Sequence, residues 1–324
     1  MRHTPSTAQL SELIHRLHES YRSLEAGTLA TYIPELGRAD PNAFGIAITT
    51  TDGETITAGD AECPFSIQSI SKPFVFGLAL ETHGLDRVRS RVGVEPTGEP
   101  FHSMIRLDNE SKKPSNPLVN TGAIAMTSLI KGSSPRAGQE LLARSLEKYA
   151  GRKLEMDATV YESEKATGHR NRAIAHLMLH FGMVEPEIEE TVDLYFRQCS
   201  FNVNAVDLSV MAATLANHGT NPKTLEKAID EKYVKCLLTL MLSCGMYTFA
   251  GEWAFSVGIP AKSGVSGGIL AVVPGEMGIG VYSPRIDSHG NSVRGIAVFK
   301  DLAEALDLHI FECRDSRAST TAGG

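Results

Sequence analysis

The chain has 324 residues, of which 42% are hydrophobic and 21% charged, and its formal net charge is −7 at pH 7. This composition is that of a globular protein with a full core, and the acidic balance without a long basic run argues against nucleic acid and anionic membrane surfaces as partners. No stretch approaches the ~20 apolar residues of a membrane span, so we expect no membrane partner.

The N-terminal segment predicts a helix and not a targeting sequence. Leu10, Leu13, Ile14 and Leu17 follow the spacing of an amphipathic helix over about residues 6–26. They leave no continuous apolar run of the kind that a secretory signal requires. We therefore predict a cytoplasmic protein.

The cysteines and histidines predict no structural bridge and no metal site. The chain has an odd number of cysteines and no CxxC pair, which favours reduced thiols in the core. The five cysteines are Cys63, Cys199, Cys236, Cys244 and Cys313. His176 and His180 are four residues apart, but only Leu177-Met178-Leu179 lies between them. Helix packing explains that pair better than zinc binding, so we expect neither a metal nor another cofactor.

A β-hairpin is predicted next in the chain. Residues 44–48 and 55–57 are apolar or β-branched and flank Asp52-Gly53, a dipeptide that favours tight hairpin turns. The segment that follows reads Ser69-Ile70-Ser71-Lys72-Pro73 and continues into an apolar run. Because proline is tolerated only in the first turn of a helix, a helix is expected to begin close to Ser69.

The middle of the chain, from about residue 83 to 248, reads mostly as helices and loops. Its periodic segments predict helices over 137–149, 171–180, 186–197, 205–217 and 225–243. The last of these is apolar almost all round, which predicts burial in the core or in an interface. Residues 161–171 are polar and are expected to form a loop that enters a helix.

The C-terminal part reads as strands again, followed by a helix. Expected strands cover 253–257, 268–273, 278–282 and 295–299, an expected helix covers 302–311, and the polar tail 314–324 is expected to be disordered. This order predicts one α/β domain with two lobes. Residues 1–68 and 249–312 would form an antiparallel sheet with the terminal helices on one face, and residues 69–248 a helical lobe, with the active site at the seam.

Two short motifs almost two hundred residues apart suggest the chemistry. Ser69 lies one helical turn before Lys72, and Lys262-Ser263-Gly264 opens a later apolar stretch. The layout is similar to that of the penicillin-recognising serine acyl enzymes. The pairs Ser128/Lys131 and Ser145/Lys148 share the spacing, but neither has a proline that would fix the serine at a helix start.

Longer motifs make the resemblance more specific. They cover about residues 30–311 and consist of Ser66–Pro73, Lys113–Ile124, Glu164–Asn171, Met211–Asn217 and Pro260–Gly268. In order, spacing and identity, the chain resembles the serine-dependent glutaminases of the bacterial and kidney/liver type. The resemblance implies a β-lactamase or penicillin-binding-protein-like fold and hydrolysis of L-glutamine to L-glutamate and ammonia. It also implies a homo-oligomer, the family's usual homotetramer.

The resemblance also implies a role for individual residues. Ser69 matches the nucleophile, Lys72 its partner, and Tyr247 the tyrosine that shares proton transfer with that lysine. The backbone N–H of Val265, with that of Ser69, matches the oxyanion hole. The residues that match the substrate-binding set, with Ser69, Tyr247 and Val265, are Tyr32, Gln68, Asn120, Glu164, Asn171 and Tyr195.

The chemistry of an amide substrate is consistent with these residue types. An amide carbonyl needs a serine activated by a base, and a lysine serves as base only when its pKa falls well below ~10.4. Burial of Lys72 near Lys262 would lower that pKa through desolvation and charge repulsion. Glu164 would bind the α-ammonium of glutamine, and the asparagines and tyrosines would donate to its α-carboxylate.

Two other functions remain open at this point. A β-lactam-binding enzyme or D-alanyl-D-alanine peptidase of the same fold is expected to have a secretory signal and a Ser-x-Asn element in its helical lobe. No signal is indicated here, and Ser200-Phe201-Asn202 has the Ser-x-Asn pattern without deciding between the two classes. A non-catalytic glutamine sensor would have lost part of the chemical set, yet Ser69, Lys72, Tyr247 and Lys262 are all present.

Overall fold

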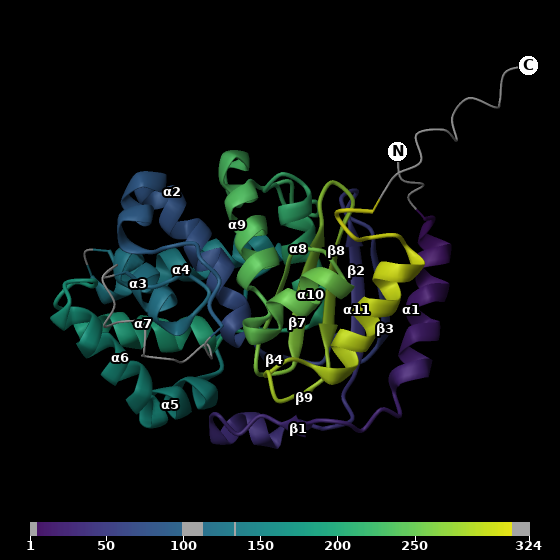
Figure 1. The fold of residues 1–324 in the computed structure, drawn as a ribbon, viewed down its shortest axis with the longest axis horizontal. Helices are drawn as coiled ribbons and strands as arrows, with labels where there is room; N and C mark the ends of the chain where they lie inside the picture. The colour runs from purple at the N-terminus through teal and green to yellow at the C-terminus, as the bar shows by residue number, and fades with distance from the viewer. Residues whose placement is uncertain (1–4, 99–112, 133, 313–324) are drawn as a thin grey trace, which may run out of the picture.

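A five-stranded antiparallel sheet forms the centre of one half of the molecule (Figure 1). The computed structural model describes residues 5–98, 113–132 and 134–312. The strand order is β3-β2-β8-β7-β6, with β2 at Gly45–Thr50, β3 at Thr55–Gly59, β6 at Ala261–Ser263, β7 at Gly268–Val273 and β8 at Met277–Tyr282. The predicted α/β class with one antiparallel sheet from both ends of the chain is therefore confirmed.

The predicted hairpin joins β2 to β3. Gly45 pairs with Gly59 and Thr49 with Thr55, and Gly53 in the turn has a φ of 86°, a backbone region that favours glycine. Two further pairs of short strands lie outside this sheet: β1 (Thr28–Leu29) with β9 (Arg285–Ile286), and β4 (Phe65–Ser66) with β5 (Asn202–Val203).

Helices cover both faces of the sheet. The terminal helices α1 (Thr7–Tyr21) and α11 (Val293–Ala305) share one hydrophobic cluster with α10 (Ala250–Ser256), as the predicted placement of terminal helices on one face requires. Helix α8 (Ala205–Ala216) lies against β8, β2 and β7. It approaches closely because Gly278 and Gly280 carry no side chain: a Cβ at Gly280 would lie 2.2 Å from the carbonyl oxygen of Ala205.

The remaining helices form a second part of the molecule around a larger hydrophobic cluster (Figure 1). They are α2 (Lys72–Arg91), α3 (Asn120–Ile130), α4 (Pro135–Ala150), α5 (Ala158–Thr167), α6 (His169–His180), α7 (Ile188–Cys199) and α9 (Glu231–Cys244). The polar segment 161–171 was expected to be a loop, but most of it is helical because Asp157 caps α5 and the break comes at Gly168. Helix α9 starts six residues later than predicted, since Leu225 has a φ of 59° and is 77% exposed.

Two predicted strands are wrong, because both segments are helical. Residues 253–257 lie mainly in α10: Trp253 and Val257 are fully buried while Phe255 between them is 84% exposed, which is the spacing of a helix turn and not of a strand. Residues 295–299 lie in α11, which Ser292 caps. That helix ends at Ala305, so the expected helix over 302–311 is only its last turn.

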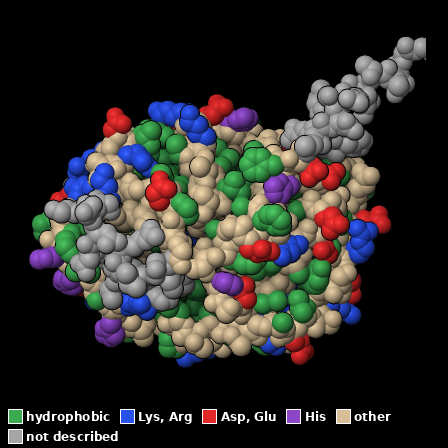
Figure 2. Space-filling model, viewed as in Figure 1, with side chains coloured by type: hydrophobic (Ala, Val, Ile, Leu, Met, Phe, Trp, Pro, Cys, Tyr) green, Lys and Arg blue, Asp and Glu red, His purple; other side chains and the backbone are tan. Residues whose placement is uncertain are grey.

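The surface and the length of the helices complete the description. Acidic and basic side chains are interspersed on the face drawn in Figure 2. No single helix among the described residues has the length and apolar composition of a membrane span, although the bent pair Glu231–Cys244 and Tyr247–Ser256 meets those criteria jointly. The predicted disordered tail lies outside the described residues.

Candidate active site

The segment around Ser69 has an unusual backbone. A 3-10 turn, η2 (Gln68–Ser71), leads directly into α2, whose second residue is Pro73. The predicted start of a helix close to Ser69 is therefore confirmed. Gln68 has a φ of 48°, a left-handed conformation that is costly for a residue other than glycine. Ser69 is 7% exposed, so its hydroxyl is nearly enclosed.

Lys72 is buried one turn after Ser69 and is held by two acceptors. Its Nζ donates to Oδ1 of Asn120 at 2.7 Å and to the carbonyl of Leu118 at 3.3 Å. Burial lowers the pKa of Lys72 to about 8, and the negative charge of Glu164 opposes that shift. Lys72 is therefore close to half neutral near pH 8, where a neutral amine is available to accept a proton.

A chain of amides and hydroxyls runs from Lys72 to the surface. Nδ2 of Asn120, the first residue of α3, donates to Oδ1 of Asn171 at 3.0 Å. Nδ2 of Asn171 donates in turn to the hydroxyl of Tyr32 at 3.1 Å. Both asparagines are buried, whereas Tyr32 is 39% exposed. The chain thus connects the buried lysine with a tyrosine at the entrance of the site.

Glu164 carries a buried carboxylate oxygen that has no partner. The residue is 2% exposed, and its Oε1 makes no hydrogen bond. Burial raises the pKa of Glu164 to about 7, and both a hydrogen bond from Gln68 and the charge of Lys72 oppose the rise. A buried acceptor without a donor is costly, and an ammonium group placed there would satisfy it and favour the ionised carboxylate.

The sheet side of the site contributes a second lysine and a tyrosine. Lys262 lies on β6, is fully buried, and has its Nζ 4.1 Å from the centroid of the Tyr247 ring. The Tyr247 hydroxyl donates to the carbonyl of Ser263 at 3.0 Å. Burial raises the pKa of Tyr247, while hydrogen bonds with Ser69 and Ser263 oppose that rise. The tyrosine hydroxyl therefore lies beside the serine hydroxyl.

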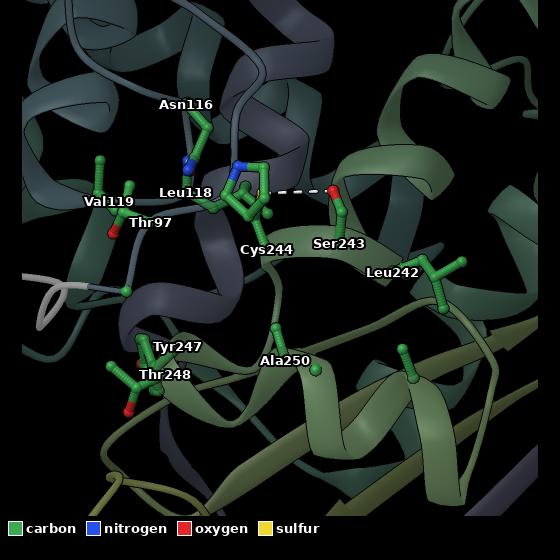
Figure 3. Close-up of a pocket in the computed structure, with 14 residues that line it drawn as sticks. Thr97, Asn116, Leu118, Val119, Leu242, Ser243, Cys244, Tyr247, Thr248 and Ala250 are labelled. Atoms are coloured by element: carbon green, nitrogen blue, oxygen red, sulfur yellow. Dashed lines mark hydrogen bonds between the residues drawn. The ribbon is translucent and has the colours of Figure 1, made fainter.

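Two neighbouring pockets meet at Tyr247. One has a volume of about 340 Å³ and is lined by Tyr32, Tyr247 and Val265 together with the loop 286–290. The other, of about 460 Å³, extends between the segment 116–119 and helices α9 and α10 (Figure 3). Figure 3 shows Tyr247 and Thr248 at one side of this second pocket. Tyr247 itself has a φ of 55°, so both Gln68 and Tyr247 are left-handed residues at the site.

All of the predicted site residues converge on this region. Tyr195, the remaining member, is buried on α7. Burial is the main cause that raises the pKa of its hydroxyl, and Cys199, Tyr32 and Glu164 add to the rise. The sequence did not point to the carbonyls of Leu118 and Ser263, because a backbone acceptor carries no side-chain signal. It treated Cys199 only as a core thiol, although its i,i+4 spacing from Tyr195 on one helix face places the two together.

Two expectations about charge and metal binding can be compared with the site. Repulsion between the two lysines lowers the pKa of Lys262, which lies well below the ordinary value because of burial and then the charge of Lys72. The pKa of Lys72 is lowered mainly by burial. Among the described residues, no group of three or more His, Cys, Asp or Glu side chains is arranged to hold a metal ion.

The comparisons with known proteins all indicate one family. The profile of the family described as Glutaminase matches residues 27–311. The chain is 56% identical over 304 residues to a protein of Trichormus variabilis named Glutaminase. The aligned region covers 94% of this chain and 91% of the relative. It is 39% identical to the solved structure of "Probable glutaminase ybaS", with a TM-score of 0.93. The match covers 95% of this chain and 100% of that one.

A further solved structure is similar over nearly the whole chain. Its title reads "Crystal Structure Analysis of Mglu in its glutamate form", and it is 39% identical with a TM-score of 0.90, covering 97% of this chain and 72% of that one. The fold is therefore the β-lactamase-like arrangement of the bacterial glutaminases.

Proposed function

The chain belongs to the glutaminase family and hydrolyses L-glutamine to L-glutamate and ammonia, and we propose that it does so through an acyl-enzyme on Ser69. The observation that carries this proposal is the buried Lys72, whose pKa of about 8 makes a neutral amine available one helical turn from the serine. No cofactor is needed for this chemistry.

In the first half of the reaction, the Ser69 oxygen attacks the side-chain carbonyl carbon of glutamine. Neutral Lys72 accepts the serine proton, while the N–H groups of Ser69 and Val265 donate to the oxyanion. When the tetrahedral intermediate collapses, the C–N bond breaks and the nitrogen takes a proton, relayed from Lys72 through Tyr247, to leave as ammonia. A γ-glutamyl ester of Ser69 remains.

In the second half, water hydrolyses that ester. A water molecule attacks the ester carbonyl and gives up a proton to the same Lys72 and Tyr247 pair. The C–O bond to Ser69 breaks, the serine regains its proton, and glutamate leaves. The hydrogen bond and ring contact of Tyr247 with the groups on β6 support its place in this relay.

Substrate recognition follows from the charges of the buried groups. We assign Glu164 to the α-ammonium of glutamine because its Oε1 is buried and has no partner. The α-carboxylate would accept from Asn120, Asn171, Tyr32 and Tyr195, and Gln68 would complete the pocket wall. The glutamate form of Mglu supports binding of such an amino acid in a relative.

The nucleophile is tested by ammonia release from L-glutamine, with L-asparagine as control substrate. Ser69→Ala is expected to lose at least about a thousandfold in kcat, because no acyl-enzyme forms. Ser145→Ala is the matched control, since Ser145 and Lys148 have the same spacing on α4 and lie outside the site; it should keep normal turnover.

Trapping the intermediate tests the acyl-enzyme itself. Hydroxylamine added to the reaction should divert part of the product to γ-glutamyl hydroxamate in the wild type and not in Ser69→Ala. Near-normal turnover of Ser69→Ala would overturn the serine mechanism. Hydrolysis of a fluorogenic penicillin without ammonia release from glutamine would instead favour the penicillin-type activity, and binding without turnover a glutamine sensor.

We also propose that the protein is a homotetramer in the cytoplasm. The family resemblance supports the tetramer, and the free thiols of Cys63, Cys199, Cys236 and Cys244 are compatible with a reducing compartment. Light scattering behind size-exclusion chromatography should give four times the 35.0 kDa of one chain; a monomer mass would contradict the tetramer. Cell fractionation tests the compartment.

A further inference from the structure

A buried chain of polar side chains ends on the peptide group that precedes Ser69. The Ser71 hydroxyl donates to the carbonyl of Gln68 at 2.7 Å. Nε2 of Gln198 on α7 donates to the same Ser71 oxygen at 3.0 Å, and the Thr127 hydroxyl on α3 lies 3.1 Å from Oε1 of Gln198. Ser71, Gln198 and Thr127 are all fully buried. None of the three belongs to the reacting or substrate-binding set.

The last bond of this chain acts on a strained backbone. Gln68 is left-handed, with a φ of 48°, so the orientation of its carbonyl is not the one that an ordinary helix start would impose. The carbonyl of Gln68 and the N–H of Ser69 belong to the same planar peptide group and point in opposite directions. A donor that fixes the carbonyl therefore fixes the direction of the Ser69 N–H.

We infer that Ser71, Gln198 and Thr127 are positioning residues that aim the Ser69 N–H at the oxyanion. The inference rests on the proposed function, in which that N–H is one of the two oxyanion donors. Preorganised donors stabilise the transition state because they need not reorient during the reaction. A bond accepted by the carbonyl also polarises the N–H on the other side of the peptide group.

The chain also explains why glutamine stands at position 198. Its side-chain amide offers a donor to Ser71 and an acceptor to Thr127 at the same time. Because Nε2 supplies the proton in its bond to Ser71, the single hydroxyl proton of Ser71 is left for the Gln68 carbonyl. The three positioning residues tie together η2, α3 and α7, which carry Ser69, Asn120 and Tyr195 respectively.

The test compares two buried serines with the same local bonding. Ser209 on α8 donates to the carbonyl three residues earlier, that of Val206, at 2.8 Å, and contacts a second side chain, as Ser71 does. It is fully buried and lies away from the site. Ser71→Ala is expected to lower kcat by about ten- to a hundredfold, less than the loss of a whole oxyanion donor. Ser209→Ala should keep kcat within twofold.

Further readouts separate positioning from a loss of structure. In Ser71→Ala, KM and the binding of the product glutamate should stay within twofold, because the N–H acts mainly on the transition state. Ser71→Thr, which keeps the hydroxyl, should restore kcat to within about threefold. Melting temperature and circular dichroism are recorded for each variant. If Ser71→Ala does not fold, Gln198→Met, similar in size but without the donor, is measured in its place. Because Ser71 keeps its hydroxyl in that variant, kcat should fall by a smaller factor, about three- to tenfold, with KM within twofold, and the kcat of the wild type would overturn the inference.

The inference is overturned if Ser71→Ala keeps the kcat of the wild type, or if its loss of kcat is accompanied by an equal loss of glutamate binding or by a similar loss of kcat in Ser209→Ala. Ser69→Ala measured in the same series distinguishes the two proposals. Loss of turnover in Ser69→Ala with normal turnover in Ser71→Ala leaves the nucleophile in place and rejects only the positioning role. Turnover in Ser69→Ala rejects both.

Discussion

The helical side and the sheet side of the site each bury one lysine, and they surround it differently. Lys72 on α2 has two oxygen acceptors and the negative charge of Glu164 nearby. Lys262 on β6 faces the ring of Tyr247 and the backbone of β6, and the charge of Lys72 adds to its desolvation. Burial lowers both pKa values, but the neighbours hold only that of Lys72 near 8.

The difference suggests separate tasks for the two lysines. A base works best when its pKa lies near the working pH, as for Lys72. The pKa of Lys262 lies well below the ordinary lysine value, and its Nζ donates to the carbonyl of Ser263 and faces the Tyr247 ring. We therefore expect Lys262 to hold Tyr247 in place and not to accept the serine proton. Each of the following predictions would sharpen or break this division.

The largest effect is expected for Lys72→Met. Methionine is of similar length but cannot accept the Ser69 proton, so kcat should fall by about a thousandfold. Ammonia release at saturating glutamine measures it. Normal turnover would show that another group is the base and would remove the contrast between the lysines.

The pH profile should change by two to three orders of magnitude between pH 9 and pH 6. Lys72 with a pKa of about 8 must be neutral to accept a proton, and Glu164 with a pKa of about 7 must be ionised to bind the ammonium. Both requirements are met at high pH, so kcat/KM should rise with pH through two ionisations. A profile that falls between pH 6 and pH 8 would contradict both assignments.

A smaller change is expected for Asn120→Asp. The new carboxylate lies beside Lys72 and favours its charged form, so the pKa of Lys72 should rise by at least about one unit. The higher of the two ionisations in the pH profile, which we assign to Lys72, should shift to higher pH. At pH 8 kcat should be about tenfold lower than in the wild type, and it should recover as the pH rises. If the higher ionisation does not shift, it belongs to a group other than Lys72.

The smallest change is expected for Lys262→Met. Burial lowers the pKa of Lys262, and methionine, an apolar side chain of similar length, fills the same space without a buried ionisable group. We expect kcat to fall by only about threefold, because the Tyr247 ring loses one contact, and the melting temperature not to fall. If Lys262→Met instead matched Lys72→Met in kcat, the sheet-side lysine would share the proton transfer.

Local patterns in the sequence were sufficient for part of this structure. Asp52-Gly53 and its flanking residues predicted the hairpin, and Pro73 predicted a helix start near Ser69; both signals act over a few residues. The expected strands at residues 253–257 and 295–299 were wrong, because short apolar runs have the same composition in strands and in buried helices. Packing on the sheet decided the outcome.

The candidate site divides in the same way. The family motifs named its side chains, and the structure brings Ser69, Lys72, Glu164 and Lys262 to one place, although their individual roles stay predictions. Residue types alone did not reveal the left-handed backbone of Gln68 or the link from Ser71 to Gln198. The bond from Gln198 to Ser71 joins residues 127 positions apart, so no local pattern could indicate it.

The sequence by itself therefore indicated the candidate side chains, through the family motifs, and several local elements, because turns, caps and motif spacing depend on neighbouring residues. The tertiary structure alone decided the protonation of that set. Burial sets the pKa of Lys72 near 8 and that of Glu164 near 7, and desolvation arises only when distant segments pack together.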